Sequence, residues 1–123
     1  DIRCCPTIRN KHGLALSSRN ERLTITEKDT ALVLFNSINN LKKKIEQARN
    51  AKDSLKMTEI KSLKKTIENQ IYQNPDIKLD YFKVIDVENF RFATEIKTNK
   101  EYRIFIAAQI AKIRLIDNIL IGC

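Results

Sequence analysis

Two apolar segments near the end of the chain constrain its fold more than any other feature. Tyr102–Ile110 and Ile113–Ile121 are rich in β-branched residues and are separated only by Ala111 and Lys112. Such segments favour β-strands, and a connection of two residues requires an antiparallel hairpin. Neither connecting residue is a favoured turn former, so the pattern leaves the register open. Lys78–Val87 has the same character and predicts a third strand.

Two amphipathic helices are predicted ahead of these strands. Thr26 is a candidate N-cap, with Asp29 three residues later, and apolar residues then recur at spacings of three and four. After a polar break at residues 50–54, Thr58 can cap a second helix, which must stop before Asn74-Pro75. Because strands follow helices without alternating with them, we expect an α+β fold, a small three-stranded antiparallel sheet covered on one face by two main helices.

Composition fits one compact domain. The chain has 123 residues, of which 42% are hydrophobic, with two Gly and two Pro, unlike a linker or a disordered tail. It has no apolar run of membrane-spanning length, and its first residues do not resemble a secretory signal, so we expect a cytoplasmic protein. The net charge of +8 suits an anionic partner, although the lysines of the two helices are interleaved with glutamates, as on a solvated face.

The N-terminal quarter is predicted to be mostly irregular. Ile2–Ile8 has the composition of a short strand that Pro6 would confine to an edge, and residues 9–24 form a long polar loop without helical or strand period. The first residue is not Met, and we expect another segment to precede it in the natural protein.

The cysteines and the histidine do not suggest a site. Cys4, Cys5 and Cys123 form neither a disulfide framework nor a metal-ligand spacing, and we expect the adjacent pair to be buried and inert. His12 has no second ligand at a suitable spacing and is expected to be exposed in a loop, so no protein-bound metal is predicted.

The loop Gly13-Leu14-Ala15-Leu16-Ser17-Ser18-Arg19-Asn20 carries the most chemistry. The hydroxyls of Ser17 and Ser18 and the local backbone N–H groups can donate to phosphate oxygens, and Arg19 offers a planar pair of donors that stays charged. From the residues alone this is only a candidate anion site, because the same residue types also form turns and caps.

Three segments resemble, in the same order, the pantothenate synthetase family. Pro6-Thr7-Ile8-Arg9, followed by the loop above and Leu23, is similar to the opening of that family's C-terminal domain. Residues 80–86 and 107–118 are similar to its later segments, so the resemblance spans nearly the whole chain. Lys11-His12 departs from the acidic residue that the family usually has before the glycine.

The resemblance implies a division of the chain and a site. Residues 1–8 would be the end of a preceding Rossmann-like domain or a linker strand, and residues 9–123 the C-terminal domain. Leu16, Ser17, Ser18 and Arg19 would contact ATP, chiefly its phosphates, and Ile8 would lie against the adenosine through its backbone. Arg19 would stabilise charge in the transition state, and Mg²⁺ would come with ATP and not from a protein site.

The resemblance also implies a reaction. Pantoate attacks ATP to give pantoyl adenylate, and β-alanine then displaces AMP to form pantothenate. Pantoate and β-alanine would bind mainly to the N-terminal domain of a homodimeric enzyme, so this fragment alone is expected to be inactive. No nucleic-acid or membrane partner is implied.

Other interpretations stay open at this point. A small basic nucleic-acid-binding module would explain the charge, although no known motif appears and the aromatic residues mostly fall at core-like positions. A purely structural interaction domain is a third possibility. Arg114, Asp117 and Asn118 are expected to make a salt bridge or a turn-closing hydrogen bond, and Asp80 and Asp86 to be solvated surface carboxylates.

Overall fold

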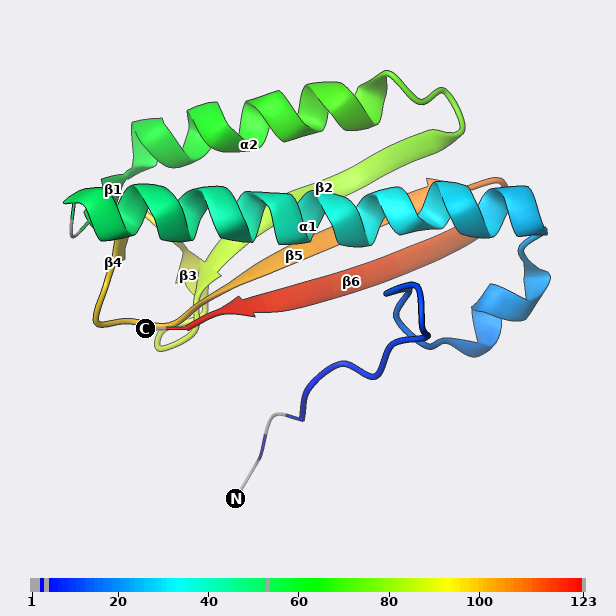
Figure 1. The fold of residues 1–123 in the computed structure, drawn as a ribbon, viewed down its shortest axis with the longest axis horizontal. Helices are drawn as coiled ribbons and strands as arrows, with labels where there is room; N and C mark the ends of the chain where they lie inside the picture. The colour runs from blue at the N-terminus through cyan, green and yellow to red at the C-terminus, as the bar shows by residue number, and fades with distance from the viewer. Residues whose placement is uncertain (1–2, 4, 53, 123) are drawn as a thin grey trace.

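A computed structural model describes residues 3, 5–52 and 54–122 of the chain. It has the predicted α+β fold, in which two helices pack on antiparallel strands (Figure 1). In chain order the elements are η1 (Ser18–Arg22), α1 (Ile25–Lys52), β1 (Ser54–Lys56), α2 (Met57–Tyr72), β2 (Ile77–Asp86), β3 (Arg91–Phe92), β4 (Glu95–Lys97), β5 (Tyr102–Ile110) and β6 (Ile113–Ile121).

The predicted three-stranded sheet is wrong in its strand count. β2, β5 and β6 are present as expected, but β3 extends the sheet to the order β3-β2-β5-β6, and β1 pairs with β4 in a separate two-stranded sheet. The missed strands are two or three residues long, which is too short for an alternating pattern to identify them. The hairpin register, which the sequence left open, pairs Ile110 with Ile113, and Ala111 adopts a positive φ of 53°.

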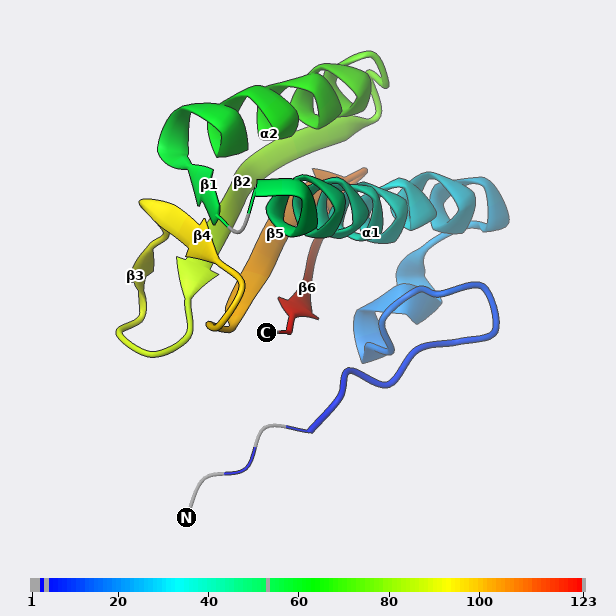
Figure 2. The same cartoon turned by 60° about the vertical axis from the view of Figure 1, so that its left-hand side comes forward.

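The helices cover one face of the larger sheet. α1 packs on β5 and β6, whereas α2 packs on β2, and the small sheet lies beside the end of α1 and the start of α2 (Figures 1 and 2). Alternate residues of β5 point into this layer and are fully buried against the apolar stripe of α1. The buried residues of these two elements include Leu34, Ile38, Leu41, Ile45, Ile104, Ile106, Ala108 and Ile110.

Both predicted N-caps are displaced by two residues. α1 begins at Ile25, and Thr24 forms its capping box: Glu27 N–H donates to Thr24 Oγ1 at 3.2 Å and Thr24 N–H to Glu27 Oε2 at 3.0 Å. Thr26 therefore lies inside the first turn. α2 begins at Met57 with Lys56 as its N-cap, and the Lys56 N–H donates to Glu59 Oε2 at 3.0 Å. In both helices, the glutamate three residues after the N-cap accepts a hydrogen bond from the N-cap backbone N–H. These bonds fix the observed helix starts.

The predicted first strand is not observed. Residues 3 and 5–8 form no strand and do not pair with either sheet, while Ile2 lies outside the described residues. Cys5 is exposed, which corrects the expectation of a buried thiol there; Cys4 and Cys123 lie outside the described residues. Without a neighbouring strand, Ile8 is 72% exposed.

A buried charge in α1 gives the first testable prediction. Arg49 is only 5% exposed, and within the described part of the chain its Nε and Nη1 atoms have no hydrogen-bond partner. Burial of an unpaired charge opposes folding. We expect Arg49→Met to raise the free energy of unfolding by about 1 kcal/mol in urea denaturation. Arg91→Met, at an exposed position of β3, is the matched control and should have no effect; a less stable Arg49→Met protein would contradict the prediction.

Candidate functional site

The loop before α1 is a tight hairpin followed by one short helix. Leu16 N–H donates to the Ile8 carbonyl and Asn10 N–H to the Leu14 carbonyl, both at 2.9 Å, so residues 8–16 fold back on themselves. Ser17 then caps η1, where its Oγ accepts from Arg19 N–H at 3.2 Å. The predicted irregular loop is therefore ordered by its own backbone hydrogen bonds.

Gly13 is required at the tip of this hairpin. Its φ is +101°, and a Cβ built there would clash with the Phe35 ring of α1. We expect Gly13→Ala to lower the free energy of unfolding by about 2 kcal/mol, because the backbone is strained and the ring must move. Gly122→Ala is the control, since an added Cβ there meets no atom within 4 Å. Equal thermal denaturation midpoints for the two variants would show that the loop tolerates the side chain.

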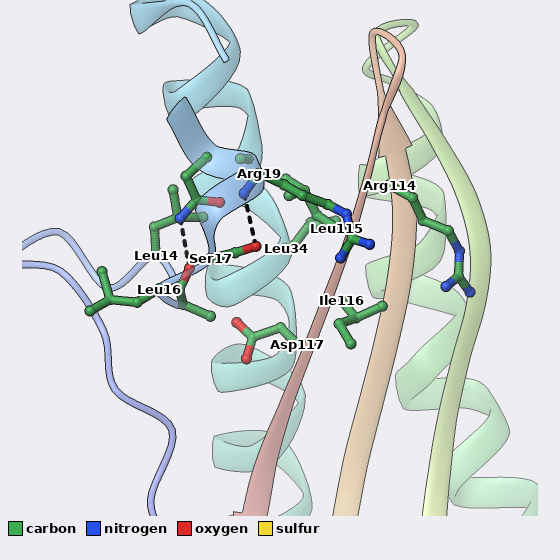
Figure 3. A pocket seen from close by; sticks show the side chains of 12 residues that line it. Leu14, Leu16, Ser17, Arg19, Leu34, Arg114, Leu115, Ile116 and Asp117 are labelled. Carbon is green, nitrogen blue, oxygen red and sulfur yellow. Dashed lines mark hydrogen bonds between the residues drawn. The ribbon is translucent and has the colours of Figure 1, made fainter. Parts of the chain in front are cut away.

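A cavity of about 190 Å³ lies between this loop, α1 and β6. The loop supplies one wall, Ala31 and Leu34 of α1 form the floor, and β6 supplies the opposite wall (Figure 3). Its volume is below the roughly 300 Å³ of the smallest typical small-molecule sites, so it suits one group of a larger ligand. The residues that line it are Leu14, Ala15, Leu16, Ser17, Arg19, Asn20, Ala31, Leu34, Arg114, Leu115, Ile116 and Asp117.

Three of the five residues predicted to contact ATP line this cavity. Leu16, Ser17 and Arg19 do so, and Arg19 extends from η1 toward β6 (Figure 3). Ser18 belongs to η1 but does not line the cavity. Ile8 lies outside it as well, and its connection to the site is the backbone hydrogen bond to Leu16.

The three arginines near the cavity differ in their partners. Arg9 is paired with Asp117 and Arg114 with Asp80, at 2.6 and 2.7 Å. The hydrogen bond from Arg114 to Asp80 raises the pKa of the Arg114 guanidinium above its ordinary value, despite partial opposition from desolvation. Among the residues that the structure describes, none forms an ion pair with Arg19. Arg19 is therefore the cation best placed to bind an anionic ligand.

Sequence reasoning missed the walls that α1 and β6 contribute. Arg114 and Asp117 belong to a segment quoted for its resemblance, but a structural role was expected of them, and both do form salt bridges. Nothing in the local sequence places β6 beside a loop that precedes it by about a hundred residues. Ala31 and Leu34 match an ordinary helical core pattern, so they gave no separate signal.

The described part of the chain has neither a metal-binding cluster nor a membrane-spanning helix. Within residues 3, 5–52 and 54–122, no group of three or more His, Cys, Asp or Glu side chains could hold a metal ion. His12 is exposed, as expected, and its backbone N–H donates to Asn10. In the same part of the chain, neither helix has the length and apolar character needed to cross a membrane.

The fold and cavity define an α+β domain whose N-terminal loop presents serine and arginine in a small anion-compatible cavity. The family model for pantoate-beta-alanine ligase matches residues 1–120. The chain belongs to this family.

Individual relatives agree with the family match. Pantothenate synthetase from Christiangramia forsetii is 35% identical over 118 residues, which cover 96% of this chain and 38% of that protein. The Pelodictyon phaeoclathratiforme enzyme is 38% identical, with 95% and 38% covered. A crystal structure of the Thermus thermophilus enzyme has the same fold, with a TM-score of 0.78 at 24% identity over 97% of this chain and 39% of that chain. The chain thus spans less than two-fifths of its relatives' length.

Proposed function

We propose that residues 9–123 are the ATP-covering C-terminal domain of an ATP-dependent ligase that condenses pantoate and β-alanine through pantoyl adenylate, releasing AMP and pyrophosphate. Family membership supports the reaction. One observation supports this role for the domain. The Arg19 guanidinium, which has no ion-pair partner among the described residues, lines a cavity together with Ser17. Residues 1–8 would connect it to a preceding Rossmann-like domain.

The cavity suits part of ATP and not the whole nucleotide. Its size accommodates a phosphate group, to which Arg19 could donate two parallel hydrogen bonds and Ser17 one more. Ser18 and Ile8 do not line the cavity, so they would contact the phosphates and the adenosine, respectively, from its margin. Pantoate, β-alanine and the remainder of ATP would bind to the rest of the complete enzyme.

The chain would act on charge and position and not by covalent catalysis. In the first step the pantoate carboxylate attacks the α-phosphorus, and negative charge grows on the departing pyrophosphate. Arg19 and Ser17 would stabilise that charge. Such electrostatic stabilisation is strongest where water is excluded. In the second step the β-alanine amine displaces AMP, and no protein nucleophile is required.

The residues present do not favour a protein-held magnesium ion in the cavity. Among the described residues, Asp117 is the single carboxylate that lines the cavity, and both of its oxygens accept hydrogen bonds from Arg9. Mg²⁺ prefers several oxygen ligands and usually arrives with substrate phosphates. Mg²⁺ bound to ATP is therefore the form we propose. A cytoplasmic homodimer, joined mainly through the N-terminal domain, completes the proposal.

The nucleic-acid alternative loses its motivation. The helix lysines that suggested it are partly neutralised, as Lys42 lies 3.8 Å from Glu46 and Lys64 lies 3.5 Å from Glu68. The prediction that the aromatic residues mostly lie at core-like positions is wrong for Tyr72, Phe90 and Phe92, which are 61%, 80% and 62% exposed. Membership of a ligase family, and not the burial of aromatic residues, favours the enzyme.

The test is AMP release from ATP in the presence of pantoate and β-alanine. The complete protein containing this chain should release AMP only when both co-substrates are present, and this fragment should release none unless its N-terminal domain is added. No AMP from the complete protein would overturn the proposal. Binding of generic DNA or RNA that survives physiological salt would favour the alternative.

A further inference from the structure

The Arg9 side chain joins three parts of the molecule that are far apart in sequence. Its guanidinium donates to both carboxylate oxygens of Asp117 on β6, from Nη1 at 2.6 Å and from Nη2 at 2.8 Å. It also donates to the carbonyls of Gly13 and Asn118, at 3.0 and 3.1 Å. Finally, its Cζ lies 4.5 Å from the centre of the Phe35 ring of α1. We call Arg9, Phe35 and Asp117 the loop clamp.

The clamp is shielded from solvent. The Arg9 and Asp117 side chains are 18% and 5% exposed, unlike the Arg114–Asp80 pair, whose side chains are more than half exposed. Planar, bidentate pairing and stacking on an aromatic ring are properties of arginine that lysine does not reproduce. The bidentate pair and the stacking therefore fix the position of the hairpin, in addition to balancing the charge of Asp117.

The clamp is linked to the candidate site through a short chain of bonds. Arg9 pairs with Ala15 in a β-bridge, and the Ala15 carbonyl accepts from Asn20 Nδ2 at 2.8 Å. Ser17 and Arg19 lie between Ala15 and Asn20, the two residues that this hydrogen bond joins. A shift of Arg9 relative to β6 would thus move both residues relative to the cavity wall.

Arg9 also sets the charge of that wall. Asp117 lines the cavity, and an unpaired carboxylate there would repel a phosphate group. With Arg9 bound to both oxygens, and with Asn118 N–H donating to Oδ1 at 2.7 Å, the carboxylate is neutralised. The cavity is left with Arg19 as its uncompensated charge among the described residues.

We propose that Arg9 and Asp117 are positioning residues for the adenylation step: they hold Ser17 and Arg19 at the phosphate and remove negative charge from the opposite wall. The proposal rests on the proposed function, since it concerns the same cavity. It assigns a role in the reaction to Asp117, for which the sequence favoured a structural role, and to Arg9, which was quoted only as part of a family motif.

The test uses Arg9→Lys in the complete protein, because lysine keeps the charge but not the four-bond, stacked geometry. The expected result is a rate of pantoyl adenylate formation in single turnover at least about 10-fold lower, since small misplacements of binding groups are costly in rate. The reaction of pre-formed pantoyl adenylate with β-alanine, which follows this step, should not change. Circular dichroism is used to verify that the variant is folded at the assay temperature.

A second readout does not depend on activity. Hydrogen exchange should accelerate at the amides of Leu16 and Asn20, whose acceptors are the Ile8 and Ser17 carbonyls, while β5 amides keep their protection. Arg103→Lys is the matched control, because Arg103 donates to the Asn118 side chain and, among the described residues, forms no hydrogen bond or ion pair with the loop. It should change neither readout.

The outcomes separate the two proposals. An active wild type, with an Arg9→Lys rate equal to that of the control, would overturn the positioning role and leave the proposed function intact. Unchanged exchange at Leu16 and Asn20 would likewise overturn it, with or without activity. A wild type that makes no pantoyl adenylate would overturn the proposed function, and a catalytic role of the clamp with it.

Discussion

In the proposed ligase reaction, Arg19→Ala in the complete protein should lower the rate of pantoyl adenylate formation by about 10²-fold or more, as loss of a transition-state donor often does. Arg19 lines the cavity without an ion-pair partner among the described residues, so in that reaction its charge would be available to the departing pyrophosphate. Single-turnover measurement of adenylate formation at saturating ATP isolates this step. The reaction of pre-formed pantoyl adenylate with β-alanine should be much less affected.

Arg22→Ala is the matched control for this experiment. Arg22 is exposed in the same short helix η1, but it does not line the cavity. The two variants lose the same net charge, so a long-range electrostatic effect would slow both to a similar extent. An unchanged rate for Arg19→Ala would remove this residue from the mechanism.

The largest expected effect on stability is that of Asp117→Ala. The substitution leaves the Arg9 guanidinium, whose side chain is 18% exposed, without its carboxylate, and removal of one partner of a buried pair is strongly destabilising. We expect the free energy of unfolding of this chain to fall by about 3 kcal/mol in urea denaturation.

Asp80→Ala is the comparison that isolates burial. The pair of Asp80 with Arg114 has nearly the same N–O distance, 2.7 Å against 2.6 Å, but both of its side chains are more than half exposed. Exposed pairs are screened by water and contribute little, so the loss should be a small fraction of that for Asp117→Ala. Equal losses would mean that the clamp has no special role in stability.

The candidate site was predictable in part. Ser17 and Arg19 were identified from side chains that suit phosphate, placed side by side in a loop, and both line the cavity. Ser18, expected on the same chemical grounds, and Ile8, expected from the resemblance, lie outside the cavity. A sequence motif specifies which residues are neighbours along the chain, whereas the turn of η1 decides which of them face inward.

The fold was predictable to the extent that periodicity could identify it. Long segments with a clear period gave α1, α2 and the three long strands of the sheet. β1, β3 and β4 depend on their partners in space, since two or three residues carry no period of their own. The first segment had the composition of a strand, but composition does not supply a neighbour to pair with.

The sequence by itself determined the two helices, the three long strands and the chemistry of the loop, because helix and strand periods, capping glutamates and the serine-arginine cluster are local properties. Only the tertiary structure decided that Arg9 meets Asp117, 108 positions further along the chain. That contact exists because α1 and β6 pack together and bring the loop against the edge of the sheet. This packing creates the cavity, in which Arg19 has no ion-pair partner among the described residues and Asp117 is neutralised by Arg9. No local sequence pattern encodes it.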